Sequence, residues 1–324
     1  MSESYQAHLA QLHAQQTISA ELLNDILHQI SPERVLSKRR IISGEINEVY
    51  DVTFADGLQI IVRISRGEAK NVAHFEQELW AIRACGARGV PIPEILGVWH
   101  RSVEGQPVGI CVQRKIHGVL LRDLNLPPHT LRQLVRQAGA LLSRIHAVPV
   151  KGFGYLNGSG EGEFVTPESE ITAFVAMEAE FHALAKRIDL SDRAMGRALR
   201  WVADDWRAAQ PIVPCLTHND FSAKHILVAN GVIAGIIDFG EVAGSEPLSD
   251  LVRWDYYDAA RFPFAWLQEG YADKQVFTTD FTRRLHIKRI AFSLWAMRWY
   301  DMRGYAEGVA DARAKFIRDL TKLA

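Results

Sequence analysis

Cysteine is scarce in this sequence, which contains only Cys85, Cys111 and Cys215 among 324 residues. The number is odd, and no two of them stand at the short spacing used by metal-binding pairs. We therefore expect neither a disulfide framework nor a zinc site. The low count fits a protein of a reducing compartment, and we expect a cytoplasmic location.

An excess of charge is also absent, because 37 Lys and Arg are balanced by 38 Asp and Glu. This balance gives no bulk attraction to nucleic acid or to an anionic membrane, and we expect neither as a partner. No apolar run approaches the length of a transmembrane helix. The first residues, MSESYQAHLAQLHAQQ, also lack the apolar core of a signal peptide.

Hydrophobic residues are plentiful, at 48% of the chain, and the length suggests two domains or lobes. The pattern predicts these elements: a helical segment at 5–30 whose second part Ser19 could cap, strands at 39–54 and 58–64, a helix at 70–88, two strands within 95–116, and helices from 128 onward. Asp56-Gly57 and Asn230-Gly231 are hairpin signals, the second within 225–239. We therefore predict an α+β protein with a small β-rich lobe, 1–116, and a larger helical lobe, 117–324.

The stretch 216-LTHNDFSAKHILVANGVIAGIIDFGEVAGSEPLSDL-251 places polar residues at both ends of the predicted second hairpin. A hairpin brings its two ends to one edge, so Asp220 and Asp238 should lie close together. Paired carboxylates suit a metal site or acid–base chemistry. Phosphoryl transfer needs a positioned base, a divalent cation and a cation on the nucleotide. Asp220 is a candidate base, and His225 and Asp238 are candidate metal ligands.

This segment resembles the catalytic segment of the aminoglycoside phosphotransferase family, which includes choline, homoserine and macrolide kinases. The matching parts are His218-Asn219-Asp220, His225, Asp238-Phe239-Gly240, Glu246-Pro247-Leu248-Ser249-Asp250-Leu251, Ser43-Gly44-Glu45-Ile46-Asn47, Arg63, Glu78, Val90-Pro91-Ile92-Pro93, Leu142-Ser143-Arg144-Ile145-His146 and Gly152-Phe153-Gly154. Each part is weak alone, and the combination is specific. The resemblance covers most of the chain and is greatest with the antibiotic-kinase branch, which includes hygromycin phosphotransferases.

The resemblance implies a two-lobed protein-kinase-like fold and a role for each matching residue. Asp220 would be the base, His225 and Asp238 would bind Mg²⁺, and Arg63, braced by Glu78, would hold the phosphates of ATP or GTP. Ser43 and Gly44 would belong to the nucleotide loop, and Ile61 would form an apolar roof over the base. The backbone at Arg114 and Ile116 would form the hinge that bonds the purine, and His218 and Asp250 would support the site structurally. Arg in place of Lys keeps the charge and adds bidentate geometry.

Plainer alternatives remain for several residues. Asp220 could be a solvated loop carboxylate, His225 a packed loop histidine and Arg63 an exposed strand arginine. Lys224 could be a surface lysine or could contact a phosphate, and Glu76 could replace Glu78 as the partner of Arg63. Magnesium prefers oxygen ligands, so the imidazole of His225 departs from the usual pattern. That departure and the single glycine of the loop leave a nucleotide-binding pseudokinase open. A metal-dependent hydrolase that uses Asp220, His225 and Asp238 is a further alternative.

A small acceptor is favoured over a protein substrate. The signatures of protein kinases are absent, and nine residues between Gly240 and Asp250 leave no room for a long activation loop. The six Glu and absent Lys and Arg of residues 152–185 could attract a polycation such as an aminoglycoside or aminocyclitol. A macrolide, an amino alcohol or another metabolite is the alternative. Trp254, Asp255 and Asp258 are either a substrate wall or core plus solvated carboxylates. We expect a monomer or homodimer.

Overall fold

The computed structural model describes residues 3–14, 18–42, 44, 46–66, 69–208 and 211–323. Its α-helices are α1 (Glu3–Ala14), α2 (Ala20–Ile30), α3 (Ala69–Gly86), α4 (Pro128–His146), α5 (Pro167–Ala176), α6 (Glu178–Arg187), α7 (Asp192–Ala208), α8 (Leu248–Tyr257), α9 (Phe264–Gly270), α10 (Phe281–Met302) and α11 (Ala306–Lys322). Its short 3-10 helices are η1 (Leu121–Asp123), η2 (Ala223–His225), η3 (Phe239–Glu241) and η4 (Lys274–Val276).

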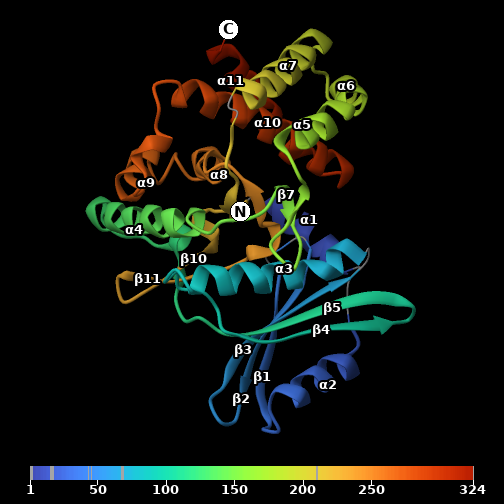
Figure 1. Ribbon diagram of the computed structural model, residues 1–324. Helices are drawn as coiled ribbons and strands as arrows, with labels where there is room; N and C mark the ends of the chain where they lie inside the picture. Colours follow the sequence, from blue (N-terminus) through green and yellow to red (C-terminus); the bar gives the residue numbers. More distant parts are fainter. Residues whose placement is uncertain are drawn as a thin grey trace.

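The strands belong to one large and two small sheets. They are β1 (Val35–Ile41), β2 (Glu48–Phe54), β3 (Gln59–Arg66), β4 (Ile95–Val103), β5 (Gln106–Arg114), β6 (Val119–Leu120), β7 (Phe153–Leu156), β8 (Gly162–Phe164), β9 (Cys215–Thr217), β10 (Ile226–Ala229), β11 (Val232–Ile236) and β12 (Ala243–Ser245). Figure 1 shows β1–β5 at the bottom, most helices at the top, and α3 between them.

The large sheet is antiparallel, with strand order β1-β2-β3-β5-β4. Alternation along β3 sends Ile60, Val62 and Ile64 into a hydrophobic core, which the apolar stripe of α2 covers from one side. The hairpin predicted at Asp56-Gly57 is confirmed between β2 and β3, with Gly57 at φ 88°. The single strand expected at 39–54 is wrong, because β1 and β2 are separate strands that pair with each other.

The predicted N-terminal helical segment consists of two helices. Ser19 caps α2 as expected, and its hydroxyl oxygen accepts a hydrogen bond from the backbone N–H of Leu22 at 3.1 Å. Helix α1 reaches the loop after β1, where Nε2 of His13 donates to the backbone oxygen of Gly44 at 2.6 Å. Near the middle of α1, the ring of His8 stacks on that of Tyr305.

Helix α3 packs on both halves of the molecule. Glu78 pairs with Arg63 of the large sheet, whereas Ala81, Ile82 and Cys85 belong to the same buried hydrophobic cluster as Leu134 and Leu142 of α4. The core of the C-terminal half therefore includes a helix from the N-terminal half of the sequence.

The C-terminal half is mostly helical and carries two small sheets, with orders β11-β10-β6 and β8-β7-β12-β9. The hairpin predicted at Asn230-Gly231 is confirmed, and both residues have the positive φ that its turn requires. An antiparallel sheet followed by a mostly helical part also confirms the predicted α+β class. The large sheet ends at Arg114, and the boundary at residue 116 remains a prediction.

The three cysteines are buried and unpaired. Among the described helices, we find none with the length and apolar character needed to cross a bilayer.

Candidate active site

Asp220 and Asp238 lie close together because β10 and β11 bring the two ends of their hairpin to one edge. Asp220 stands just before η2, and Asp238 follows β11. His225 links them: its Nε2 is 3.2 Å from Oδ2 of Asp238, and its Nδ1 is 2.9 Å from the backbone oxygen of Asp220. Both ring nitrogens therefore face oxygen atoms.

The backbone is strained at both ends of this hairpin. Asp238 has φ 68° and ψ 58°, and Asn219 has φ 59°, in the left-handed region that residues other than glycine rarely adopt. Strain of this kind persists only where surrounding contacts hold it, and it is concentrated at functional sites. One of the two positions is Asp238 itself, and the other directly precedes Asp220.

Arg63 connects the large sheet to this edge. Its guanidinium lies 2.5 Å from Oε1 of Glu78 on α3 and 2.9 Å from Oδ1 of Asp238. Burial opposes the charge of Arg63, but the two carboxylates outweigh it and raise its pKa. Helix α3 makes a second contact with the segment after Asp238, because Nε2 of Gln77 donates to the backbone oxygen of Gly240 at 2.7 Å. Glu78, rather than Glu76, is thus the helix partner of Arg63.

Asp250, at the start of α8, supports the loop that carries Asp220. Its fully buried carboxylate accepts hydrogen bonds from the backbone N–H groups of His218 and Asn219, at 2.8 and 2.7 Å. Nε2 of His146 donates to the same carboxylate at 2.9 Å. The ring of His218 in turn bridges the backbone of Asp220 and that of Ile237, so it braces both ends of the hairpin.

The acidic residues of the site are held in their ionised forms. Burial would raise the pKa of Asp220, but His225, Lys224 and Arg253 outweigh it and hold the pKa below its ordinary value. Burial of Asp238 is likewise outweighed, chiefly by His225 and Arg63, and its pKa lies well below the ordinary value. Both carboxylates are therefore negatively charged at neutral pH.

Two further cations lie beside Asp220. Nζ of Lys224 is 3.0 Å from Oδ2 of Asp220, so this lysine is paired with the acidic group rather than being an isolated surface residue. The guanidinium of Arg253 donates to Oδ1 of Asn219 at 3.3 Å and lies 4.1 Å above the ring of Phe292. Stacking on an aromatic ring fixes the position of a guanidinium.

A divalent cation fits the donor atoms at this edge. Asp220, His225 and Asp238 each offer one ligand atom, and these three atoms lie within 4.8 Å of one another. Carboxylate oxygens suit Mg²⁺, and imidazole nitrogen is an acceptable ligand for several divalent ions. Nδ1 of His225 faces the backbone oxygen of Asp220, which leaves Nε2, on the side of Asp238, as the nitrogen that would bind a metal.

The expected nucleotide-binding residues lie along the adjacent edge of the large sheet. Ile61 shares the face of Arg63, since its neighbours Ile60 and Val62 point into the core. Arg114 is exposed and pairs with Glu94 at 2.6 Å, whereas Ile116 packs over Gly235 of β11. Gly44 contacts α1 as described above, and Ser43 lies outside the described residues.

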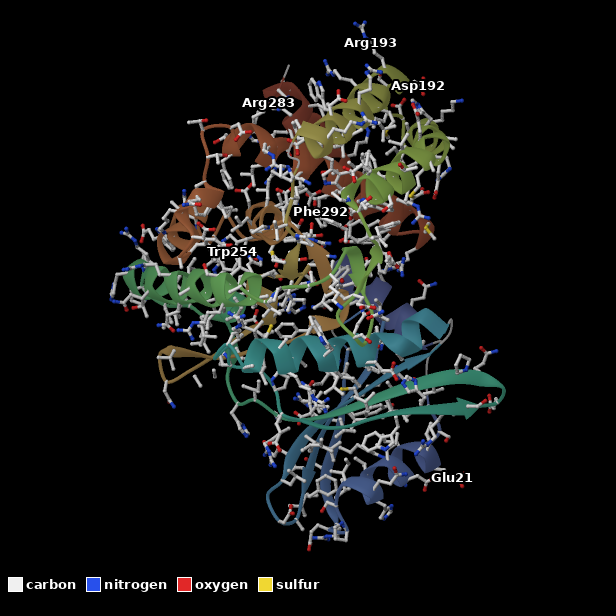
Figure 2. All side chains as sticks on the ribbon, in the orientation of Figure 1. Glu21, Asp192, Arg193, Trp254, Arg283 and Phe292 are labelled. Carbon is white, nitrogen blue, oxygen red and sulfur yellow. The ribbon has the colours of Figure 1, made fainter. Side chains whose placement is uncertain are left out.

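The expected substrate wall on α8 is wrong for Trp254, which is fully buried. Figure 2 labels Trp254 among the side chains of the helical half. Its ring packs between those of Phe221 and Phe262, and Nε1 donates to the backbone oxygen of Phe262 at 3.1 Å. Asp255 does not present a free carboxylate, because Oδ2 lies 2.5 Å from the guanidinium of Arg289.

Asp258 lies nearer to the candidate base, since its Oδ2 accepts a hydrogen bond from the backbone N–H of Ala223 at 2.9 Å. Burial raises the pKa of Asp258 to about 6. Asp258 thus anchors the loop that carries Asp220, and the structure does not place it with Trp254 and Asp255 on one open wall.

The acidic segment 152–185 is partly neutralised by cations. Glu161 faces Lys151 at 3.5 Å, and Glu180 faces Arg298 at 2.5 Å. A second acidic group is closer to Asp220: Glu241 accepts a hydrogen bond from the hydroxyl of Tyr155 at 3.0 Å. Burial raises the pKa of Glu241, and the charges of Asp220 and Asp238 add to that rise.

The sequence interpretation missed Gln77, Arg253 and Glu241. Gln77 stands next to Glu78, and Arg253 follows Asp250 by three residues, one helical turn. That spacing is a usable signal for Arg253, because Asp250 was already assigned to the support of the catalytic loop. Nothing in the sequence near Glu241 distinguishes it from a surface glutamate.

The chain is similar to known phosphotransferases. Residues 38–284 match the phosphotransferase enzyme family, APH. Hygromycin-B 4-O-kinase of Escherichia coli is 27% identical over 170 residues, which are 52% of this chain and 48% of that enzyme. The match thus spans about half the length of this curated relative.

Solved structures give the same result for the fold. Aminoglycoside phosphotransferase APH(4)-Ia, as a thermostable mutant with ADP and hygromycin B, has a TM-score of 0.73 at 20% identity and covers 92% of this chain and 97% of its own. The gentamicin complex of APH(2")-IIa has a TM-score of 0.65 at 15% identity and covers 93% and 97%. The kinase-like fold expected from the sequence is confirmed. Together with the match over residues 38–284, it shows that the chain belongs to the phosphotransferase enzyme family.

Proposed function

We propose that this protein is a Mg²⁺-dependent phosphotransferase that moves the γ-phosphoryl group of ATP or GTP to a hydroxyl of an aminoglycoside or aminocyclitol. The observation that carries the proposal is the meeting of Asp220, His225 and Asp238 within 4.8 Å, with Arg63 bonded to both Asp238 and Glu78. A base, a cation site and a phosphate-binding cation are the parts that phosphoryl transfer requires.

Residues 1–116 would bind the donor. Arg63 presents a permanent positive charge at the edge of the sheet, and the carboxylates of Glu78 and Asp238 fix its orientation. Ile61 would cover the base, Ser43 and Gly44 would contact the phosphates, and the backbone at Arg114 and Ile116 would bind the purine edge. ATP is the favoured donor, because related kinases have been solved with ADP and AMP-PNP.

Residues 117–324 would carry the cation and the base. Asp238 and His225 would hold Mg²⁺, which neutralises charge on the transferring phosphates when bound. Asp220 would orient the acceptor hydroxyl and accept its proton. The lowered pKa of Asp220 makes it a weak base, but a loose phosphoryl-transfer transition state depends more on orientation than on basicity.

The acceptor side supports a cationic small molecule. Glu241 lies near Asp220, and the pKa of Glu170 is raised to about 7 by burial and by neighbouring carboxylates that include Glu163. An added positive charge would relieve the repulsion among these groups. The relatives named above act on hygromycin B or bind gentamicin, both of which fit this chemistry.

A nucleotide diphosphate release assay tests the proposal. The purified protein would be given ATP or GTP with Mg²⁺ and a panel of hygromycin B, aminoglycosides, macrolides, choline and homoserine, with Asp220→Asn as the blank. We expect a rate that depends on an aminoglycoside or aminocyclitol, is absent from the blank, and yields a product heavier by one phosphoryl group. Nucleotide binding without turnover on any compound would overturn the proposal in favour of a pseudokinase. Turnover with another compound would correct the acceptor class alone.

A further inference from the structure

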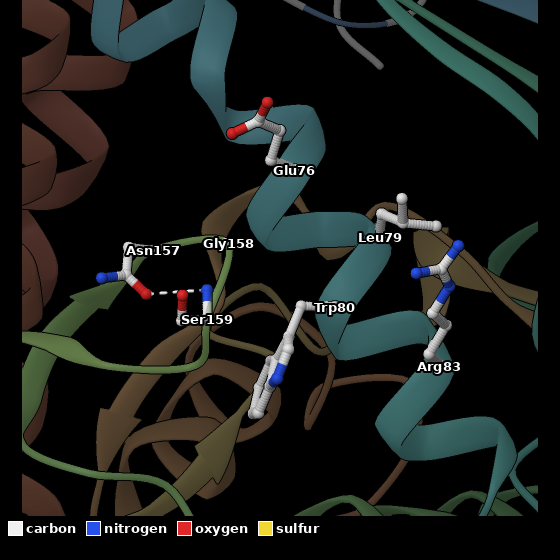
Figure 3. Close-up of a pocket in the computed structure, with 7 residues that line it drawn as sticks. All are labelled: Glu76, Leu79, Trp80, Arg83, Asn157, Gly158 and Ser159. Atoms are coloured by element: carbon white, nitrogen blue, oxygen red, sulfur yellow. Dashed lines mark hydrogen bonds between the residues drawn. The ribbon is translucent and has the colours of Figure 1, made fainter.

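The turn between β7 and β8 contacts α3 from the side opposite to Arg63. A Cβ atom added to Gly160 would lie 2.1 Å from the ring of Trp80, and one added to Gly158 would lie 3.2 Å from Cβ of Glu76. The backbone of the turn therefore rests directly on the helix, and only glycine permits this approach. A groove of about 450 Å³ runs along the contact (Figure 3).

The turn is rigid in its own right. Oδ1 of Asn157 accepts hydrogen bonds from the backbone N–H groups of Ser159 and Glu161, at 2.8 and 3.1 Å. The backbone of Asn157 also bonds to that of Glu161 at 2.9 Å and that of Gly160 at 3.0 Å. Strand β7 in turn pairs with β12, which follows η3 and Asp238. The turn is thus coupled to the segment that carries Asp238.

Helix α3 lies between this turn and the active site. Glu76 and Trp80 are four residues apart and share one face, whereas Glu78 is two residues from each and points the other way, toward Arg63. Gln77 bonds to Gly240 on the active-site side. Displacement of the helix away from the sheet would therefore require the turn to move as well.

We propose that Trp80 and the Asn157–Gly160 turn are positioning residues that hold α3 so that Glu78 stays bonded to Arg63 before any nucleotide binds. The inference rests on the proposed phosphotransferase function, since it assigns Arg63 and Glu78 to the donor site. Affinity for the donor falls in proportion to the fraction of molecules in the competent arrangement. If loss of the contact leaves about one molecule in ten competent, the Kd of the Mg²⁺–nucleotide complex rises about tenfold.

Gly160→Ala and Gly105→Ala form a matched pair for the test. Both glycines have φ +77°, so alanine brings the same backbone strain at each, but Gly105 has nothing within 4 Å of the added Cβ. Binding of Mg²⁺ with AMP-PNP would be measured by calorimetry. We expect Gly160→Ala to raise the Kd about tenfold and Gly105→Ala to leave it within about twofold. Trp80→Ala should also weaken nucleotide binding, whereas Trp80→Phe should retain most of the affinity. The double variant Gly160→Ala with Trp80→Ala should have the same Kd as Trp80→Ala alone.

Hydrogen exchange of the amides of α3 gives a second reading that needs no nucleotide. Gly160→Ala should speed exchange around Glu78, and Gly105→Ala should not. Equal effects of the two glycine variants on both readings would overturn the inference, as would a loss of thermal stability in Gly160→Ala with unchanged affinity and exchange. A wild-type protein that binds no nucleotide would refute the proposed function, and the exchange comparison would still decide the role of the turn.

Discussion

At the scale of single residues, Asp220 is the group on which the proposed chemistry depends most. Asp220→Asn keeps the size of the side chain and removes its ability to accept a proton. We expect turnover to fall about 10²–10⁴-fold, with the Kd of the Mg²⁺–nucleotide complex within a few-fold of wild type. Steady-state kinetics and calorimetry would measure the two quantities. Undiminished turnover would remove Asp220 as the base.

His225 is the ligand whose chemistry departs from the pattern of oxygen donors. His225→Gln would supply an amide oxygen near the position of Nε2, whereas His225→Ala would supply nothing. We expect the glutamine variant to keep Mg²⁺-dependent turnover within about tenfold of wild type, and the alanine variant to need at least about tenfold more Mg²⁺. Magnesium titration of the initial rate measures both. Equal Mg²⁺ requirements in all three proteins would show that His225 is only a packed loop histidine.

At the scale of elements, the first turn of α8 supports the catalytic loop through one carboxylate. Asp250 accepts two backbone N–H groups and His146, so Asp250→Asn would leave at least one buried donor without an acceptor. We expect a loss of about 1–3 kcal/mol in the free energy of unfolding and a parallel loss of activity. Urea unfolding checks the first, with Asp56→Asn in the exposed β2–β3 turn as the control. Similar midpoints in the two variants would contradict this account.

The elements that could be predicted are those with a strong local signal. Asp56-Gly57 and Asn230-Gly231 predicted both hairpins because the glycine of each pair adopts the positive φ that the turn requires. Strands β7, β9 and β12 were missed because each has three or four residues, too few to show a period of two. The start of α2 was predicted from Ser19, because a hydroxyl side chain before an apolar helical pattern is a capping signal.

The site was predictable where its residues are close in sequence. Asp220, His225 and Asp238 lie on one hairpin, so their meeting follows from a local turn. Gln77 and Glu241 come from a helix and a loop that only the tertiary fold brings together. The prediction that Trp254 lines the substrate site was wrong because an aromatic residue beside two carboxylates fits a binding wall and a buried helix face equally well.

At the scale of the whole molecule, Glu170 links stability to pH. Burial raises its pKa from 4.5 to about 7, with Lys288 opposing the rise and Glu246 and Glu163 adding to it. The folded state then holds a proton that the unfolded state has lost, so stability falls as pH rises from about 4.5 to about 7. Relative to Glu170→Gln, wild type should lose up to about 3 kcal/mol of unfolding free energy between pH 5 and pH 8.

Urea unfolding at the two pH values measures this difference, and Glu168→Gln, an exposed neighbour on the same helix, is the matched control. A gap between wild type and Glu170→Gln that stays constant with pH would contradict the assignment.

The sharing of α3 between the two halves has a consequence for dividing the chain. Ala81, Ile82 and Cys85 fill part of the C-terminal hydrophobic cluster, so a cut near residue 117 would give two fragments that each lack part of a core. Neither fragment should fold alone, and each would complete the other when they meet. If the fragments were fused to two proteins that bind each other, the proposed phosphotransfer would be restored only when those two proteins associate. In cells exposed to the proposed aminoglycoside acceptor, growth would then report that association.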